Sequence, residues 1–294
     1  MNTVPKPYLW LIGSRPQTWA AAIAPVLVGC GEAIRLGGFS LPRALLALLV
    51  ALALQIGVNY ANDYSDGIKG TDLNRVGPLR LTASGSFSSQ VVKRAAFLSF
   101  GVASLAGLWL VSLAGAWWLV IVGLLAVIAA WTYTGGKRPY GYLGLGEVGV
   151  FVFFGLVAVA GTVYTQVGSV SSVTWLAASG IGLIACAILM VNNIRDLPKD
   201  RLVGKNTLAV RLDERNARIA YAGMVLIPLL LNLIIAFTAP WVLITLVLWV
   251  PGLILAIGVL LGSRGRLLVP FLVGTGMYEL SFGILLAIGL GAGK

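Results

Sequence analysis

Residues 42–66 read PRALLALLVALALQIGVNYANDYSD, an apolar run that ends in two aspartates, Asp63 and Asp66. The part from 42 to 61 is long enough for a helix to cross the roughly 30 Å hydrocarbon core of a bilayer. The two aspartates are three positions apart, so a helix that continues past the run places both carboxylates on one face. The stretch therefore predicts a transmembrane helix with an acidic cluster where it leaves the membrane.

The remainder of the chain has the same apolar character. Of its 294 residues, 59% are hydrophobic and 11% are charged, whereas soluble domains are about one quarter charged. Its 37 glycines suit the close approach of transmembrane helices. We expect an all-α integral membrane protein in which residues 1–294 form a single transmembrane domain. The apolar runs predict nine transmembrane helices, at about 17–34, 42–61, 92–112, 115–134, 147–166, 174–194, 217–236, 240–262 and 268–291.

The basic residues predict how these helices are oriented. With nine spans, 18 of the 21 Lys and Arg residues fall on the side of the N-terminus. The positive-inside rule then places the N-terminus in the cytoplasm and the C-terminus outside, in a multi-pass protein of the plasma membrane. The two longest connections on that side, 62–94 and 195–218, hold seven of the ten acids. Long loops often carry function, so we expect the active site at the cytoplasmic face.

Composition also excludes several kinds of chemistry and partner. The net charge of +11 is spread over short loops between apolar runs, which favours anionic lipid head groups and an anionic substrate over nucleic acid. Histidine is absent, so imidazole is available neither as a metal ligand nor as a general base. Cys30 and Cys186 lie inside apolar runs and are expected to be inert, unpaired thiols.

The first acidic cluster has the composition of a magnesium site. Asn59 and Asn62 lie one turn before Asp63 and Asp66, on the same predicted helix face. Carboxylate and amide oxygens suit Mg²⁺, which often binds substrate phosphates as well. Asn and Asp also cap helices, so this cluster alone fits either interpretation.

A second cluster repeats the pattern and favours function. Asp196 and Asp200 are four apart at the end of the sixth predicted span, with Asn193 one turn earlier and Lys205 nearby. Two carboxylate pairs on the same side of the membrane can hold two Mg²⁺ ions that bind a diphosphate and stabilise it as a leaving group.

Further cations lie in the loops between the two clusters. Lys137 and Arg138 follow a pair of glycines and are candidates to contact an anionic oxygen. Arg80 lies in a Gly-, Pro- and Ser-rich stretch, 77–85, that we interpret as a lid over the first cluster. Glu147 and Glu279 lie near or within apolar runs, and no role is assigned to either.

These motifs, in this order, resemble those of the UbiA superfamily of intramembrane prenyltransferases. Asn62-Asp63-x-x-Asp66 is similar to the first Asp-rich motif of that family, Asp196-x-x-x-Asp200 to the second, and Tyr133-x-x-x-Lys137 to the tyrosine–lysine motif. The opening Arg15-Pro16-Gln17-Thr18 and the run 77–85 resemble the branch that prenylates 1,4-dihydroxy-2-naphthoate in menaquinone synthesis. One position departs from the superfamily pattern, because Gly70 stands where an aspartate is common and Asp72 follows two residues later.

The resemblance implies nine helices around a central cavity that is capped by cytoplasmic loops. It also implies Mg²⁺, a polyprenyl diphosphate donor and a 1,4-dihydroxy-2-naphthoate acceptor. The expected reaction releases diphosphate and CO₂ and gives a demethylmenaquinol in the membrane. Alternatives are another acceptor such as 4-hydroxybenzoate or a porphyrin, a cation-coupled transporter, and a phosphatidyl-alcohol transferase, whose Asp-Gly-x-x-Ala-Arg core is missing. The predicted roles fall on Asp63, Asp66, Asp196 and Asp200 as metal ligands, on Lys137 in catalysis, and on Arg15, Asn59, Asn62, Arg80, Tyr133, Arg138, Asn193 and Lys205 in substrate binding.

Overall fold

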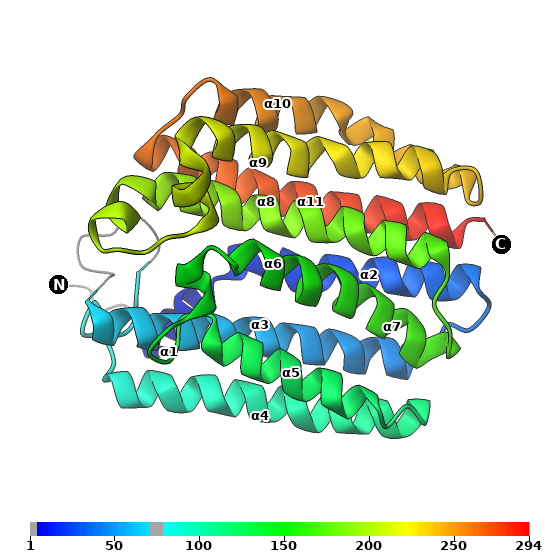
Figure 1. The fold of residues 1–294 in the computed structure, drawn as a ribbon. Coiled ribbons are helices and arrows are strands. Elements are labelled where there is room, and N and C mark those ends of the chain that lie inside the picture. Colours follow the sequence, from blue (N-terminus) through cyan, green and yellow to red (C-terminus); the bar gives the residue numbers. More distant parts are fainter. Residues whose placement is uncertain (1–4, 71–78, 294) are drawn as a thin grey trace.

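The chain folds into a bundle of roughly parallel helices (Figure 1). The structure is a computed structural model that describes residues 5–70 and 79–293, and all regular elements in these residues are helical. The α-helices are α1 (Lys6–Gly13), α2 (Ala20–Arg35), α3 (Leu41–Lys69), α4 (Ser89–Ala114), α5 (Leu119–Thr132), α6 (Gly146–Val150), α7 (Ala158–Val167), α8 (Ser172–Leu202), α9 (Leu208–Ile235), α10 (Trp249–Leu260) and α11 (Val269–Gly291). Shorter or tighter helical pieces are η1 (Pro16–Thr18), η2 (Tyr140–Leu143), the π-helix η3 (Phe151–Val157), η4 (Pro240–Leu248) and η5 (Gly265–Leu268).

Many of these helices are long and apolar enough to cross a membrane. Seven qualify within the described residues, and the pair Lys6–Thr18 and Ala20–Arg35 makes an eighth if its 54° bend is taken as one broken span. The predicted range 115–134 holds α5, which has only 14 residues, or about 21 Å of helix. The chain is therefore a multi-pass membrane protein, and the count of nine crossings stays a prediction.

Two helices extend further than the sequence predicts. α3 continues to Lys69 and α8 to Leu202, so the loops expected at 62–94 and 195–218 begin later. Polar residues at the end of each helix face the interior of the protein, which lets the helical hydrogen bonds continue beyond the apolar run. The four aspartates of the two predicted clusters consequently lie on rigid helix ends instead of in loops.

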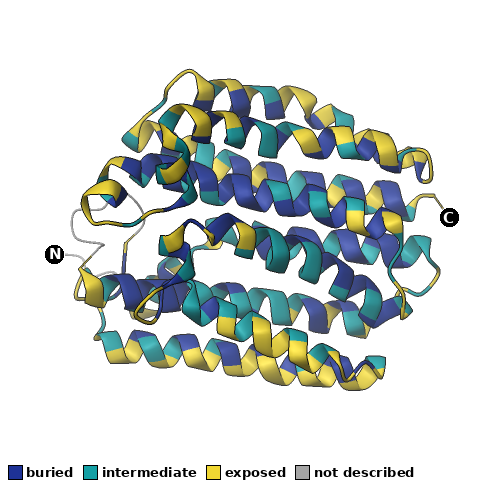
Figure 2. Cartoon of the chain, viewed as in Figure 1, coloured by how far each residue is buried: buried dark blue, intermediate teal, exposed yellow. Residues whose placement is uncertain are grey.

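α8 is the centre of the bundle. In its apolar window 72% of residues are buried, against 28–39% in the other candidate spans. Figure 2 shows the contrast between this helix and the exposed outer faces of α4 and α10. A helix surrounded by protein buries all its faces, whereas one at the perimeter turns an apolar face to lipid. α8 packs closely on η3 because Gly155 meets Gly182, where an added Cβ would lie 2.6 Å from the opposite Cα.

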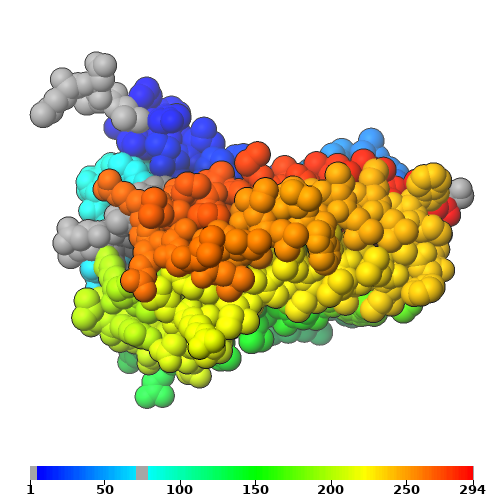
Figure 3. Space-filling model, turned by 90° about the horizontal axis from the view of Figure 1, so that it is seen from above, coloured from blue at the N-terminus to red at the C-terminus, as the bar shows by residue number. Residues whose placement is uncertain are grey.

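The end of the bundle that lies opposite the aspartates is closed by polar contacts. Glu32 is fully buried on α2 and accepts two hydrogen bonds from Arg35, at 2.7 and 2.6 Å. The hydroxyl of Ser171, the N-cap of α8, donates to the same carboxylate at 2.6 Å. α2 and the start of α8 are thus tied together here. Figure 3 shows the neighbouring side of the molecule, where α9, α10 and α11 form a continuous surface and α1 projects at the end that carries the aspartates.

Candidate active site

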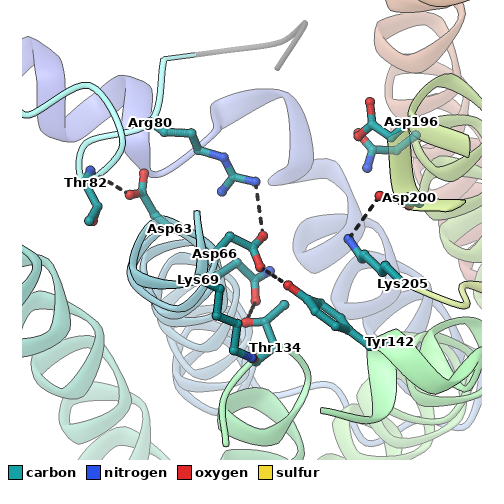
Figure 4. Close-up of polar contacts among 12 residues, drawn as sticks. Asp63, Asp66, Lys69, Arg80, Thr82, Thr134, Tyr142, Asp196, Asp200 and Lys205 are labelled. Carbon is teal, nitrogen blue, oxygen red and sulfur yellow. Dashed lines mark hydrogen bonds and ion pairs between the residues drawn. The ribbon is translucent and has the colours of Figure 1, made fainter. Parts of the chain in front are cut away.

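The first aspartate of α3 holds the loop that follows this helix. Asp63 is buried and accepts two hydrogen bonds of 2.8 Å, from the backbone N–H groups of Leu81 and Thr82 (Figure 4). Gly67, one turn further along α3, leaves room for this contact, since an added Cβ would lie 2.6 Å from the Cβ of Thr82. Asp63 therefore fixes the turn that carries Arg80 over the end of α3.

The second aspartate of α3 is held from two sides by other elements. The hydroxyl of Tyr142 on η2 donates to Oδ1 of Asp66 at 2.7 Å. Nη2 of Arg80 lies 3.7 Å from Oδ2, and both side chains of this ion pair are largely buried. Charge-assisted contacts of this kind are strong when they are desolvated. The carboxylate of Asp66 therefore has a defined orientation.

The two asparagines of the first cluster connect α3 with neighbouring segments. Oδ1 of Asn62 accepts a 2.7 Å hydrogen bond from the hydroxyl of Thr134, in the turn after α5. Nζ of Lys69 donates to the carbonyl of the same Thr134 at 2.7 Å. Asn59 donates from its amide nitrogen to the carbonyl of Ser14 at 2.8 Å. α3 thus positions two other segments of the site, the turn at Thr134 and the segment at Ser14.

The second aspartate pair, on α8, is also accompanied by cations. Arg195 donates to both oxygens of Asp196, at 2.8 Å each, and to Oδ1 of Asn192 at 2.8 Å. Nζ of Lys205 lies 3.9 Å from Oδ1 of Asp200. Figure 4 shows that the two pairs lie on different helices, with Arg80 beside the first pair and Lys205 beside Asp200 of the second. The structure therefore brings together the two clusters, which are more than a hundred residues apart in the sequence.

A buried glutamate orients the asparagine that precedes the second pair. Oε1 of Glu147 on α6 accepts a 3.0 Å hydrogen bond from the amide nitrogen of Asn193. Since that nitrogen is the donor, the amide oxygen of Asn193 stays available as an acceptor, and Asn193 lines the cavity described next. Glu147, to which the sequence assigned no role, thus orients the side chain of Asn193.

These polar groups form one end of a cavity of about 560 Å³ inside the bundle. That volume falls in the usual range for small-molecule sites. The rest of the cavity is apolar, with walls contributed by α3, α5, η3 and α8, among them Leu54, Val127, Phe153, Phe154 and Leu189. A ligand with a charged end and a long apolar body would match this division. Eight of the predicted site residues line the cavity: Arg15, Asn59, Asn62, Asp66, Arg80, Tyr133, Asn193 and Lys205.

Two of the lining residues show features expected of a binding site. Arg15 has a left-handed backbone conformation with φ 54°, which is strained for a residue other than glycine. Its buried Nη2 makes no hydrogen bond within residues 5–70 and 79–293, so this donor suits an anion in the cavity. Tyr133 lines the same end of the cavity, and its ring packs edge-on against that of Tyr140, with the ring centroids 5.5 Å apart.

The other predicted residues lie outside the cavity wall. Lys137 and Arg138 are exposed on the turn after α5, so contact with a ligand in the cavity stays a prediction for both. Asp63, Asp196 and Asp200 are not among the residues that line the cavity. Asp72 lies outside the described residues. Sequence reasoning missed Tyr142, whose only signal was an aromatic residue close to a basic, glycine-rich turn.

The donor set at this rim fits a magnesium ion better than a transition metal. In the part of the chain that the structure describes, no three Asp, Glu, Cys or His side chains converge as a metal site. A bound ion would combine carboxylate oxygens, amide oxygens and oxygens of the ligand itself, which is how Mg²⁺ is commonly held. The side chains available for this are Asp66 and Asn62 on α3 and Asp200 and Asn193 on α8.

An all-helical membrane bundle with a charged rim above an apolar cavity defines a class of protein that acts on amphiphilic anions. The chain matches the UbiA prenyltransferase family over residues 22–289 and belongs to that family. It is an aromatic prenyltransferase, since its curated relatives carry that activity in their names.

Two relatives and one solved structure illustrate the likeness. The 1,4-dihydroxy-2-naphthoate octaprenyltransferase of Mycobacterium tuberculosis is 45% identical over 285 residues, which cover 97% of each chain. The protein of the same name from Escherichia coli is 44% identical, over 74% of this chain and 72% of its own. A UbiA homolog from Archaeoglobus fulgidus, solved with GPP and Mg²⁺, superposes with a TM-score of 0.62 at 15% identity, covering 95% of this chain and 99% of its own. That structural likeness confirms the fold.

Proposed function

We propose that the protein transfers a polyprenyl group from polyprenyl diphosphate to 1,4-dihydroxy-2-naphthoate, with loss of diphosphate and CO₂, to give a demethylmenaquinol. The observation that carries this proposal is the charged rim opening onto an apolar cavity. The names of the relatives support the choice of acceptor. The Mg²⁺ and GPP of the Archaeoglobus fulgidus homolog support the choice of metal and donor.

The cations at the rim are suited to the diphosphate of the donor. Arg15, through its Nη2 that lacks a hydrogen bond among the described residues, and Lys205 both reach the cavity. Mg²⁺, held by Asp66 and Asp200 together with the other predicted ligands, Asp63 and Asp196, would neutralise charge on the departing diphosphate. Each of these carboxylates is already oriented by a neighbouring cation or hydrogen bond, so little rearrangement is needed to bind the ion. The apolar walls take the prenyl chain and keep water from the reacting carbon.

Arg80 is the residue that we assign to the acceptor. It lines the cavity and is carried by the turn that Asp63 anchors, on the side of the rim away from Lys205. The carboxylate of a naphthoate needs a cationic partner, and a guanidinium binds it with two parallel hydrogen bonds. In this structure Arg80 is paired with Asp66. A metal bound to Asp66 would compete for that carboxylate and favour a contact between Arg80 and the acceptor.

For the membrane arrangement we propose one domain of nine crossings, with the N-terminus and the active site in the cytoplasm and the C-terminus outside. The basic residues support it, since 18 of 21 fall on the proposed cytoplasmic side. Exposed aromatic residues at the opposite end indicate a second membrane interface there, because aromatic side chains gather at both interfaces. They are Phe39, Trp117, Trp118, Trp175, Phe237 and Trp241.

The test of the function is an assay of purified protein in detergent with a polyprenyl diphosphate, Mg²⁺ and one aromatic acid at a time. We expect product only with 1,4-dihydroxy-2-naphthoate, at a mass that shows loss of CO₂, and no product after chelation of Mg²⁺. If 4-hydroxybenzoate is the only acid that is prenylated, the proposed acceptor is wrong and the enzyme is still an aromatic prenyltransferase.

A further inference from the structure

Tyr142 occupies a junction between the two halves of the charged rim. It lies on η2, the short turn between α5 and α6. Its hydroxyl donates to Asp66 on α3 at 2.7 Å. Its backbone carbonyl accepts a 3.0 Å hydrogen bond from the N–H of Asn206, in the loop that follows α8. One residue thus contacts α3, which carries the first aspartate pair, and the loop after α8, which carries the second.

The ring of Tyr142 interacts with two ammonium groups. Nζ of Lys69 lies 4.9 Å from the ring centroid and Nζ of Lys205 lies 5.0 Å from it. Figure 4 shows the Tyr142 ring between these lysines. Both distances are within the range of cation–π attraction. The ring therefore separates two like charges and stabilises each of them.

The two lysines have different surroundings beyond the ring. Lys69 donates to the carbonyl of Thr134 and is not part of the cavity wall. Lys205 lines the cavity and lies 3.9 Å from Asp200. Loss of the ring would leave Lys205 free to turn toward solvent, since a lysine side chain has several rotatable bonds. Lys205 is thus held at the cavity by two contacts, the ring of Tyr142 and the carboxylate of Asp200.

We propose that Tyr142 is a positioning residue for the donor, which orients Asp66 through its hydroxyl and holds Lys205 at the cavity through its ring. Its main effect is on the diphosphate end of the site, since Tyr142 itself does not line the cavity. This inference rests on the proposed function, because it takes the rim to be a diphosphate site.

The two parts of this role can be separated with two substitutions. Tyr142→Phe keeps the ring and removes the hydroxyl, whereas Tyr142→Leu removes both. Binding of inorganic pyrophosphate with Mg²⁺ to the full-length protein, measured by calorimetry, reports on the rim without any turnover. We expect about tenfold weaker binding for Tyr142→Phe, from loss of a hydrogen bond to a charged group. Tyr142→Leu should weaken it by roughly another tenfold, through the two cation–π contacts.

Steady-state kinetics supply the second measurement. The KM of the donor should rise in Tyr142→Phe and rise further in Tyr142→Leu, while the KM of the acceptor changes less. Tyr164→Phe is the control, since Tyr164 lies on α7 near the opposite end of the bundle and packs against Trp118. It should bind pyrophosphate as the wild type does.

The possible results distinguish this inference from the function on which it rests. If wild-type protein fails to bind pyrophosphate, the diphosphate site itself is wrong. If the wild type binds pyrophosphate and both Tyr142→Phe and Tyr142→Leu bind it with the wild-type affinity, the role of Tyr142 is wrong and the function stands. An equal loss in both substitutions would assign the effect to the hydroxyl alone and overturn the role of the ring. Should Tyr142→Leu fail to fold, the Phe substitution still decides the hydroxyl, and Lys205→Met in place of Tyr142→Leu decides whether Lys205 contributes to binding.

Discussion

The two aspartates of α3 are three residues apart and have different surroundings. Asp63 accepts backbone hydrogen bonds from the 81–82 turn, whereas Asp66 lines the cavity and contacts Tyr142 and Arg80. Both are predicted metal ligands, and the structure adds a loop-anchoring contact to Asp63. Substitutions of these two residues should therefore fail in different ways.

For Asp66→Asn we expect turnover to be abolished, because the substitution removes a charged oxygen ligand from the rim. Asp63→Asn keeps one acceptor oxygen but places an NH₂ group against the other backbone N–H. Loss of one charged hydrogen bond, about 1.5–3 kcal/mol, should reduce kcat/KM of the acceptor roughly ten- to a hundredfold. The measurement is a pair of Mg²⁺ and acceptor titrations on each variant. If the Mg²⁺ concentration needed for half-maximal activity rises as much in Asp63→Asn as in Asp66→Asn, metal binding is the main role of Asp63 and anchoring of the loop is secondary.

Arg80 provides the test of how the acceptor is held. If it binds the naphthoate carboxylate, Arg80→Ala should raise the KM of the acceptor about ten- to a hundredfold, with a smaller effect on the donor. Arg80→Lys should recover only part of this loss, since an ammonium cannot offer the two parallel donors of a guanidinium. Titrations of each substrate on the wild type and both variants supply the comparison. An acceptor KM that does not change would move Arg80 away from the carboxylate.

At the scale of elements, the approach of the 79–88 loop to α3 depends on one glycine. Gly67→Ala adds a methyl group 2.6 Å from the Cβ of Thr82, while alanine itself favours the helix. We expect the loop to be displaced, so that activity falls about tenfold, by analogy with loss of one hydrogen bond of Asp63. The thermal midpoint in detergent should stay close to that of the wild type.

Gly101→Ala on α4 is the matched control for this prediction. No atom lies within 4 Å of its added Cβ, so alanine should stabilise the helix by about 0.5–1 kcal/mol and leave activity unchanged. Equal activity in the two variants would show that the position of the loop does not matter for catalysis.

At the scale of the whole molecule, the charged rim and the Glu32 cluster mark opposite ends of the bundle. The end of α3 that carries the aspartates lies at the same end of Figure 1 as α1, and α11 finishes at the other end. An odd number of crossings would produce this arrangement. The bent pair of α1 and α2 and the short α5 decide whether the number is nine.

Single cysteines supply the topological test. In a background without Cys30 and Cys186, cysteines at positions 70 and 205 should react with a membrane-impermeant maleimide only from the cytoplasmic side of vesicles. A cysteine at position 170 should react only from the outside. Labelling of all three positions from the same side would contradict the proposed number of crossings between them.

Much of the fold could be predicted from the sequence because hydropathy and helical spacing are local properties. Apolar runs such as 42–61 must form helices in lipid, where backbone groups have no water to bond. The spacing of Asp63 and Asp66 placed them on one helix face, and the Asn and Asp composition of both clusters pointed to a magnesium site. The same local signals did not give how far α3 and α8 continue past their apolar runs, to Lys69 and Leu202, because the polar residues there face protein and not solvent.

Only the tertiary structure decided the contacts between segments that are distant in the sequence. Tyr142 meets Asp66 across 76 positions, and Asn193 meets Glu147 across 46. The exposure of Lys137 and the cavity position of Lys205 likewise depend on how the turns fold back on the bundle. The physical reason is that such contacts follow from the packing of helices whose order in space is not encoded in any single stretch. The sequence alone thus predicted which polar groups form the candidate site, and packing determined which of them line the cavity.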